Sequence, residues 1–380
     1  MYKRQQLYNI ADTLIVSHAI GRDALAAVGS AYTLMIFLTS ILLGLSMGAG
    51  ALFSICRGRG DESGLRQSIV HAFGLIGVCT LLLTALAYAL LPALLRLLQV
   101  PESVSPLMRT YLAVIFAGIP ATFLYNFFAC LLRSVGNSMT PLVFSGISAL
   151  GNVALDLLFV LVFPWGVAGA ALATVLSQVA SAVLTLRCIA GSEGAPWHIR
   201  AEKLRLHTEV LAAICMIGIP AAAQSAMYNV SNMLIQSSMN SFGTSTIAAW
   251  GVYGKIDFVF WMTINSLGIA ITTFAGQNFG ARQYDRVRNG VRVCMAMAAG
   301  VTLVISAVFY NAAEPLFRLF SQDDAVVAVG VGMMHVLTPV YITYISIEVL
   351  SGALRGCGDV RVPTLITVFF VCGLRVLWLT

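Results

Sequence analysis

The chain has 380 residues, of which 59% are hydrophobic and only 10% are charged, and its mean hydropathy is +0.88. A soluble protein carries about 25% charged residues, so this composition excludes a secreted domain, a cytosolic enzyme and a receptor with a single membrane anchor. The net charge of +6 does not indicate nucleic-acid binding, because no stretch interleaves many basic and aromatic residues. The eight cysteines form no CxxC motif or Cys/His cluster, so we expect neither a zinc site nor a disulfide framework.

Apolar segments follow one another along most of the sequence. A membrane-spanning helix needs about 20 apolar residues, and the pattern predicts eleven helices, over 7–20, 28–55, 69–98, 107–132, 139–163, 166–190, 210–240, 246–277, 291–314, 325–354 and 362–380. The clearly polar connection between the sixth and seventh helices covers 191–209. The sequence therefore predicts an all-α polytopic membrane protein with an N-lobe (1–190), a cytoplasmic linker (191–209) and a C-lobe (210–380).

Basic residues orient these helices. With the N-terminus in the cytoplasm, 16 of the 22 Lys and Arg residues fall on the inner side and 4 on the outer side, while Lys255 and Arg375 fall within spans. Because cytoplasmic loops carry the excess of Lys and Arg, we predict a multi-pass protein of the plasma membrane with its N-terminus in the cytoplasm.

The two halves of the chain repeat one another. Matched positions keep an offset of 220 to 222 residues throughout, which chance matches would not hold. Matched segments include Leu7-Tyr8-Asn9 with Met227-Tyr228-Asn229, Leu132-Arg133 with Leu354-Arg355, Gly136 with Gly358 and Pro141 with Pro363. Six helices separate equivalent positions, so the repeats run parallel and predict two six-helix lobes related by a pseudo-two-fold axis along the membrane normal.

The same repeat predicts that parts of the twelve-helix plan are missing. Pro220 precedes Tyr228 in the second half, and its equivalent in the first half would fall before Met1. At the other end, Thr380 is equivalent to Leu158, inside the fifth helix. We therefore expect part of helix 1, the end of helix 11 and helix 12 to be absent.

Ionisable residues inside apolar helices are costly and are functional candidates. They are Asp12, Asp156, Lys255, Asp257 and Glu348. Asn152 lies four residues before Asp156, which places both side chains on one helix face. A carboxylate and an amide oxygen suit a hard monovalent cation or a proton, although a carboxylate that is only satisfied by neighbouring hydroxyls remains the alternative.

These acids do not follow the repeat. Asp12 is equivalent to Asn232 and Glu348 to Asn126, so we predict two separate polar sites, one in each half. Lys255 and Asp257 are two residues apart and cannot pair on one helix face. We expect Lys255 to meet Glu348 or another acid across a helix interface, either to hold helices together or to serve transport.

The sequence contains no P-loop, nucleophile elbow or HExxH motif, and this argues against an ATP-driven pump or an intramembrane metalloprotease. A non-transporting receptor or an intramembrane transferase would need no internal repeat. We therefore expect a protein that is not an enzyme and that uses no organic cofactor.

An ordered set of motifs resembles the multidrug and toxic compound extrusion (MATE) family over nearly the whole chain. The motifs are Gln6-Leu7-Tyr8-Asn9-x-x-Asp12-Thr13, Ala24-Leu25-Ala26-Ala27-Val28-Gly29, Leu132-Arg133-x-x-Gly136-x-x-x-x-Pro141, Asn152-x-x-x-Asp156, Gly166-Val167-Ala168-Gly169-Ala170-Ala171-x-Ala173-Thr174 and Gly276-Gln277-Asn278-x-Gly280-Ala281. The resemblance implies a secondary active antiporter, expected to be a monomer in the lipid membrane, that exports small organic, often cationic, compounds in exchange for Na⁺ or H⁺ by alternating access.

The resemblance also implies a cation site. In the DinF-like branch of the family, the site in the N-lobe matches Asp12, Asn152, Asp156 and Thr174 of this sequence, with no metal expected beyond Na⁺. A proline of the family's first helix has no counterpart here. Alternatives are a lipid-linked precursor flippase of the same superfamily, which would favour a cationic cavity, and a non-transporting fragment.

Overall fold

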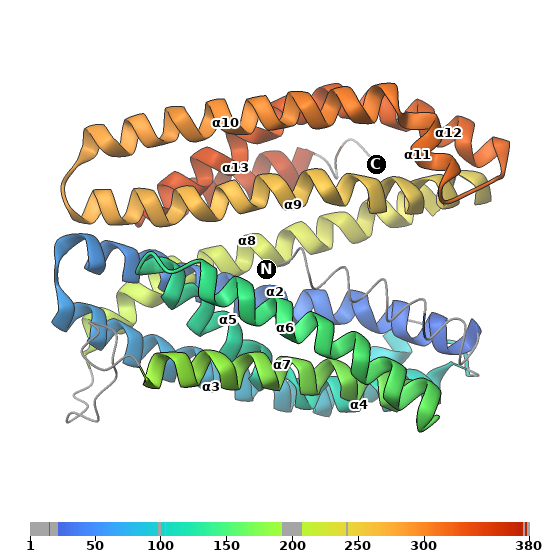
Figure 1. Cartoon of the computed structure of the whole chain (residues 1–380), viewed down its shortest axis with the longest axis horizontal. Coiled ribbons are helices and arrows are strands. Elements are labelled where there is room, and N and C mark those ends of the chain that lie inside the picture. Colours follow the sequence, from blue (N-terminus) through green and yellow to red (C-terminus); the bar gives the residue numbers. More distant parts are fainter. Residues whose placement is uncertain are drawn as a thin grey trace. The chain divides into compact units, whose positions relative to one another are not determined.

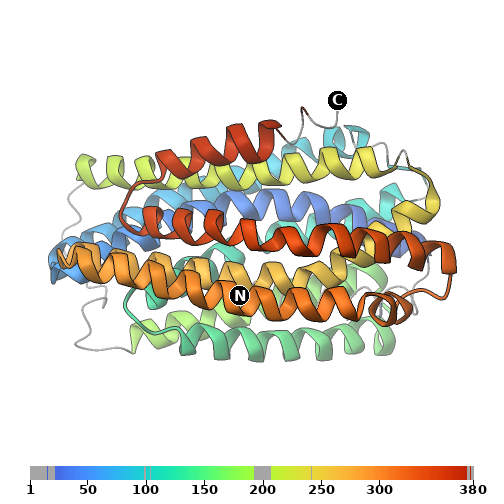
Figure 2. The ribbon, with the colours of Figure 1, turned by 90° about the horizontal axis from the view of Figure 1, so that it is seen from above.

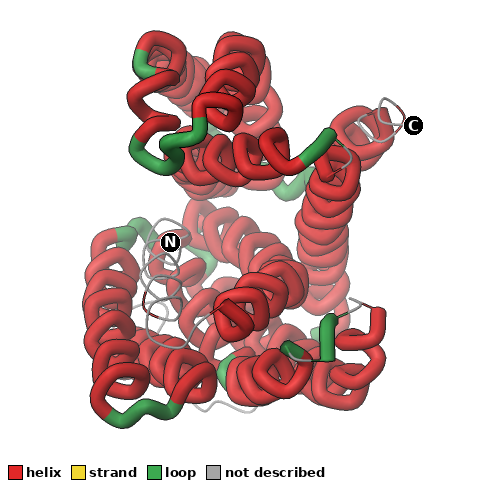
Figure 3. Tube along the Cα trace, turned by 90° about the vertical axis from the view of Figure 1, so that its right-hand side faces the viewer, coloured by secondary structure: helices red, strands yellow, loops and turns green. Residues whose placement is uncertain are grey.

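The computed structural model describes residues 22–97, 100–102, 104–191, 207–240 and 242–374, together with Ile15 and Leu377. Over these residues the chain forms helices joined by loops and turns, with no strand (Figure 3). Eight helices of the described part are long and apolar enough to cross a membrane, or nine if one bent pair is a single span. The predicted all-α polytopic class is therefore confirmed. Most of the segment predicted over 7–20 lies outside the described residues.

The helices divide between two compact units. The first unit takes its residues from the chain up to Phe53 and from Asp61–Ser225, and the second from Ser54–Gly60 and from Ala226 onward. The ends of two long helices, α2 and α8, thus belong to the second unit. The predicted lobe boundaries, with their linker over 191–209, stay a prediction.

The elements from α2 to α8 alternate long spans with one bent pair. They are α2 (Arg22–Arg59), α3 (Glu62–Leu97), α4 (Ser105–Ala117), α5 (Ile119–Ser134), α6 (Met139–Asp156), the π-helical η1 (Leu157–Val162), α7 (Gly166–Ala190) and α8 (Thr208–Asn240). The helices α4 and α5 are bent by 43° at Gly118. Close packing of α2 on α8 depends on small residues, because a Cβ at Gly48 would lie 2.7 Å from the Cα of Gly218.

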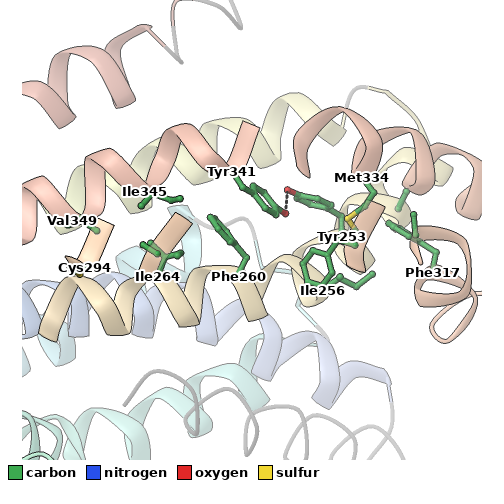
Figure 4. Close-up of a cluster of buried hydrophobic side chains, with 14 of the residues drawn as sticks. Tyr253, Ile256, Phe260, Ile264, Cys294, Phe317, Met334, Tyr341, Ile345 and Val349 are labelled. Atoms are coloured by element: carbon green, nitrogen blue, oxygen red, sulfur yellow. Dashed lines mark hydrogen bonds between the residues drawn. The ribbon is translucent and has the colours of Figure 1, made fainter. Parts of the chain in front are cut away.

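The second unit is built around one long helix. Its elements are α9 (Thr244–Gly280), α10 (Tyr284–Asn311), α11 (Ala313–Arg318), α12 (Asp324–Leu337), the 3₁₀ turn η2 (Thr338–Val340), α13 (Tyr341–Gly356), α14 (Arg361–Ile366) and the π-helical η3 (Thr367–Gly373). The helices α9, α10 and α13 pack side by side (Figures 1 and 2). Large apolar side chains from these helices and from α11 and α12 form one buried cluster between them (Figure 4).

The internal repeat is visible in the backbone. Helices α5 and α13 are both 16 residues long and start 222 positions apart, and each follows an interruption, at Gly118 and at η2. Each also ends in the same cap, because Gly136 and Gly358 have φ of +95° and +89°. The next amides, of Asn137 and Asp359, donate to carbonyls five residues earlier at 2.8 and 3.0 Å. This left-handed cap favours glycine, which explains why both glycines stand at equivalent positions.

Candidate functional site

Two serine hydrogen bonds fix the register of α6 against α7. The Oγ atom of Ser148 donates to the carbonyl of Ser177 at 2.5 Å. One turn away on each helix, the Oγ atom of Ser181 donates to the carbonyl of Phe144 at 3.5 Å. The residue numbers rise along α6 as they fall along α7, so the two helices run antiparallel. One further turn in the same register brings Asn152 to the level of Ala173, next to Thr174.

Three of the predicted site residues are therefore buried at neighbouring levels of the packed pair α6 and α7. Asn152 and Asp156 are 0% exposed and Thr174 is 7% exposed. Neither polar atom of the Asn152 side chain, nor the hydroxyl of Thr174, has a hydrogen-bond partner among the described residues. A buried polar group left in that state costs about 1–3 kcal/mol. The fourth predicted residue, Asp12, lies outside the described residues.

The helix changes its winding directly after Asp156. Asp156 is the last residue of α6, and the π-helical segment η1 begins at Leu157. Gly169 of α7 packs against this segment, because a Cβ at that position would lie 2.9 Å from the carbonyl oxygen of Phe159. The ring of Trp165 stacks on that of Phe159 at a centroid distance of 4.9 Å. Single π-turns inside helices are frequent at functional sites.

A second polar group, in the second unit, surrounds Asp257. The hydroxyl of Tyr341, the first residue of α13, donates to the Asp257 carboxylate. The hydroxyls of Tyr341 and Tyr253 lie 2.9 Å apart (Figure 4). The carboxylate and the two tyrosine hydroxyls therefore form one connected group. The ring of Phe260 stacks on Tyr341 at a centroid distance of 4.0 Å. The two tyrosine hydroxyls are therefore hydrogen-bonded beside an apolar ring.

The remaining predicted acid, Glu348, is hydrogen-bonded to a different tyrosine. The hydroxyl of Tyr344 donates to Oε2 of Glu348 at 3.1 Å. The ring of Trp261 lies 4.3 Å from the ring of Tyr344. Glu348 faces Gly268 of α9, where a Cβ would lie 2.9 Å from its Cγ. Asp257 and Glu348 thus occupy separate positions along the interface of α9 with α13.

The predicted ion pair of Lys255 is wrong. Arg66 forms an ion pair with Glu62, and Arg318 with both Glu314 and Asp324, whereas Lys255 forms none with an acid among the described residues. Lys255 is exposed, and its Nζ atom lies 5.6 Å from the centroid of the Phe320 ring. Glu348 faces Gly268, which is thirteen residues further along α9, or about 20 Å at 1.5 Å per residue. Lys255 therefore cannot reach Glu348.

The tyrosines at these acids were missing from the predicted site. Tyr253 precedes Asp257 by four residues and Tyr344 precedes Glu348 by four residues. This spacing places each hydroxyl on the face of its acid. A tyrosine four residues before an acid in an apolar helix is therefore the signal that would have identified Tyr253 and Tyr344, whereas Tyr341 comes from another helix and has no such signal.

Comparison with known proteins identifies relatives over the whole length. A family model described as MatE matches residues 3–158 and 220–379 of the chain. The probable multidrug resistance protein YpnP of Bacillus subtilis (strain 168) is 31% identical over 93% of this chain and 79% of its own length. The probable multidrug resistance protein YoeA of the same strain is 25% identical over 98% of this chain and 82% of its own length. In fold, the chain is similar to a MOP superfamily transporter from Pyrococcus furiosus Vc1 (DSM3638), with a TM-score of 0.93 at 20% identity, over 100% of this chain and 85% of that one.

Proposed function

Because the chain belongs to the MATE family of multidrug efflux transporters, which are multi-pass membrane proteins and not enzymes, we propose that it is a secondary active antiporter. In this proposal it exports small organic, often cationic, compounds in exchange for Na⁺ or H⁺ by alternating access. The observation that carries the proposal is the buried group of Asn152, Asp156 and Thr174. The polar side-chain atoms of Asn152 and Thr174 have no hydrogen-bond partner among the described residues. Helix packing alone therefore gives no reason for polar residues at these two buried positions.

The proposed coupling site consists of Asp12, Asn152, Asp156 and Thr174. Carboxylate, amide and hydroxyl oxygens are the ligands that hard cations prefer, and the residues present therefore fit Na⁺. A proton bound to one of the carboxylates would neutralise its negative charge just as Na⁺ would. A carboxylate without a cation or proton is costly at this depth in a membrane, so occupation and release of the site change the energy of the helices that hold it. No organic cofactor enters the proposal.

The second unit offers a separate polar site for the transported compound. Asp257 and Glu348 lie beside Tyr341, Tyr344 and Trp261. Aromatic faces and a carboxylate together attract organic cations. We assign substrate binding, rather than ion coupling, to this group. Lys255 lies outside it.

The test is efflux of a fluorescent cationic dye from everted membrane vesicles, with a Na⁺ gradient and a pH gradient imposed separately. We expect one gradient to drive efflux, and we expect Asp156→Asn and Asn152→Ala to reduce the driven efflux at least tenfold at equal protein level. Glu102→Gln is the matched control, because Glu102 is an exposed acid in the connection between α3 and α4. Driven efflux that survives both substitutions would contradict the coupling site. Absence of efflux under every gradient would favour the flipping of lipid-linked precursors instead.

A further inference from the structure

Two distant chain segments meet at one end of the second unit. The last residues of α2, Ser54–Gly60, belong to this unit and pack against the end of α9. A Cβ at Gly58 would lie 2.8 Å from the Cα of Gln277, and a Cβ at Gly280 would lie 3.1 Å from the amide nitrogen of Arg59. The backbones therefore approach as closely as glycine allows. This contact joins the end of α2 to the connection between α9 and α10.

Six exposed arginines gather at this junction. Together they form the arginine cluster, which consists of Arg57, Arg59, Arg282, Arg286, Arg288 and Arg292. None of the six is within ion-pair distance of an acid among the described residues, in contrast to Arg66 and Arg318. The stretches 57–59 and 282–292 contain one acid, Asp285, against these six cations. The cluster is thus a strongly positive surface without an internal counter-charge.

The internal repeat allows the charge at this connection to be compared with its equivalent. By the offset of 222, residues 279–292 are equivalent to 57–70. The first stretch has four arginines and one acid, a net charge of 4 − 1 = +3, and the second has three arginines and two acids, a net charge of 3 − 2 = +1. Arg66 is paired with Glu62 at 3.6 Å. Both connections are basic, as cytoplasmic loops generally are, but the second carries more positive charge than its equivalent. The ends of α2 and α9 bring the two basic stretches together within the second unit.

The surface next to the arginine cluster is suited to lipid tails. The exposed face of α10 that begins at Arg286 continues two turns later with Val293 and then Met297, which are 59% and 56% exposed. Val304 and Val308 extend the same face, at 65% and 52% exposure. One helix face thus presents Arg286 at its start and an apolar stripe along the remainder, while the exposed Arg288 and Arg292 lie on the other side of the first turns of α10. A phospholipid has the complementary order of charge and hydrocarbon.

We propose that the arginine cluster binds the phosphate groups of anionic phospholipids, whose acyl chains lie along the exposed stripe of α10. Arginine forms strong, bidentate hydrogen bonds with phosphate, and a basic segment at the end of a membrane helix is attracted to anionic lipid headgroups. The bound lipid supplies the counter-charge that the chain itself lacks. The proposal is independent of the transported compound and of the coupling ion.

The test uses the purified full chain in a neutral detergent, titrated with phosphatidylglycerol or with phosphatidylcholine of the same acyl chains, and followed by native mass spectrometry and thermal unfolding. We expect phosphatidylglycerol to be retained and to raise the Tm, and phosphatidylcholine to do neither. A triple variant, Arg286→Gln, Arg288→Gln and Arg292→Gln, should bind phosphatidylglycerol at least tenfold more weakly, because each arginine near a membrane surface contributes about fivefold in affinity. The matched control replaces Arg96, Arg109 and Arg318 by Gln and should change binding less than twofold.

Two further arms separate the alternatives. Replacing the same three residues by Lys keeps the charge and should keep most of the binding, which covers the case in which the Gln variant fails to fold. Glycerol phosphate and inorganic phosphate at equal concentration should not raise the Tm. Equal retention of phosphatidylcholine, equal weakening in the control variant, or the same Tm shift with glycerol phosphate would each overturn the proposal.

Discussion

The backbone of Gly268 occupies the position from which a side chain would collide with the carboxyl group of Glu348. A Cβ at residue 268 would lie 2.9 Å from Cγ and 3.0 Å from Cδ of Glu348. One turn further along α13, a Cβ at Gly352 would lie 2.7 Å from the carbonyl oxygen of Gly268. The helices α9 and α13 therefore approach closely beside the Glu348 carboxyl group.

From this contact we expect Gly268→Ala to displace the Glu348 carboxyl from the Tyr344 hydroxyl. Overpacking of this kind costs about 1–3 kcal/mol, which thermal unfolding in detergent would detect as a lower Tm. Gly300→Ala is the matched control, because a Cβ there has no atom within 4 Å and Ala is preferred over Gly inside a helix by about 0.5–1 kcal/mol. A Tm that rises equally in both variants would show that the collision is relieved at no cost.

Replacement of Tyr341 by Phe removes the hydroxyl that links Asp257 with Tyr253. The ring and its stacking on Phe260 remain, so the loss concerns the hydrogen bonds alone. We expect a destabilisation of about 1–3 kcal/mol, because a buried group loses its donor. Tyr310→Phe, at an exposed tyrosine of α10, is the control. In a double-mutant cycle with Asp257→Asn the two effects should couple, and strictly additive effects would refute the contact.

The thiol of Cys357 lies just beyond the end of α13, outside the span. Burial, and next the charge of Asp359, raise the pKa of Cys357 above its usual value. A raised pKa leaves less thiolate at neutral pH, and the thiolate is the reactive form. In a variant that keeps this cysteine alone, alkylation by N-ethylmaleimide should be slower at pH 7.5 than for a free thiol and should rise about tenfold per pH unit. Asp359→Asn should lower the pKa of Cys357 and speed the reaction at pH 8; a rate that levels off below pH 8.5 would contradict the raised pKa.

The two equivalent helix caps should tolerate substitution equally poorly. Alanine at Gly136 or at Gly358 must adopt a left-handed backbone, which costs about 1–2 kcal/mol. Gly74→Ala is the control, since that glycine has no positive φ and no atom within 4 Å of an added Cβ. The two cap variants should lower the Tm by similar amounts and add when combined. A lower Tm in only one of the two cap variants would contradict the equivalence of the two helix caps.

Most span positions were predictable because each needs a long apolar run, but the interruptions were not. The segment 325–354 was predicted as one helix, and Asp324–Gly356 is long and apolar enough to be one span, but its winding tightens to a 3₁₀ turn at Thr338–Val340, where Pro339 lacks an amide proton. The change from α-helix to π-helix after Asp156 could not be predicted, because the apolar residues 157–162 contain no proline or glycine that would indicate it. The common face of Asn152 and Asp156 followed from their spacing, and the level of Thr174 only from contacts between helices. The error at Lys255 has the same origin, since no spacing within one helix gives the distance to another.

The wide turn that follows Asp156 gives α6 a position at which a single side chain can change its direction without unfolding of the helix. In η1 the amide of Phe163 reaches back five residues, to the carbonyl of Leu158, so this part of the helix holds one residue more than an α-helical turn does. If the wide turn moved back past Asp156, the residues that it passed would rotate by about 100° about the helix axis, and the rest of the helix would keep its orientation. A carboxylate at the edge of the wide turn would then leave the face of α7 for another neighbour, and only a few hydrogen bonds would exchange partners.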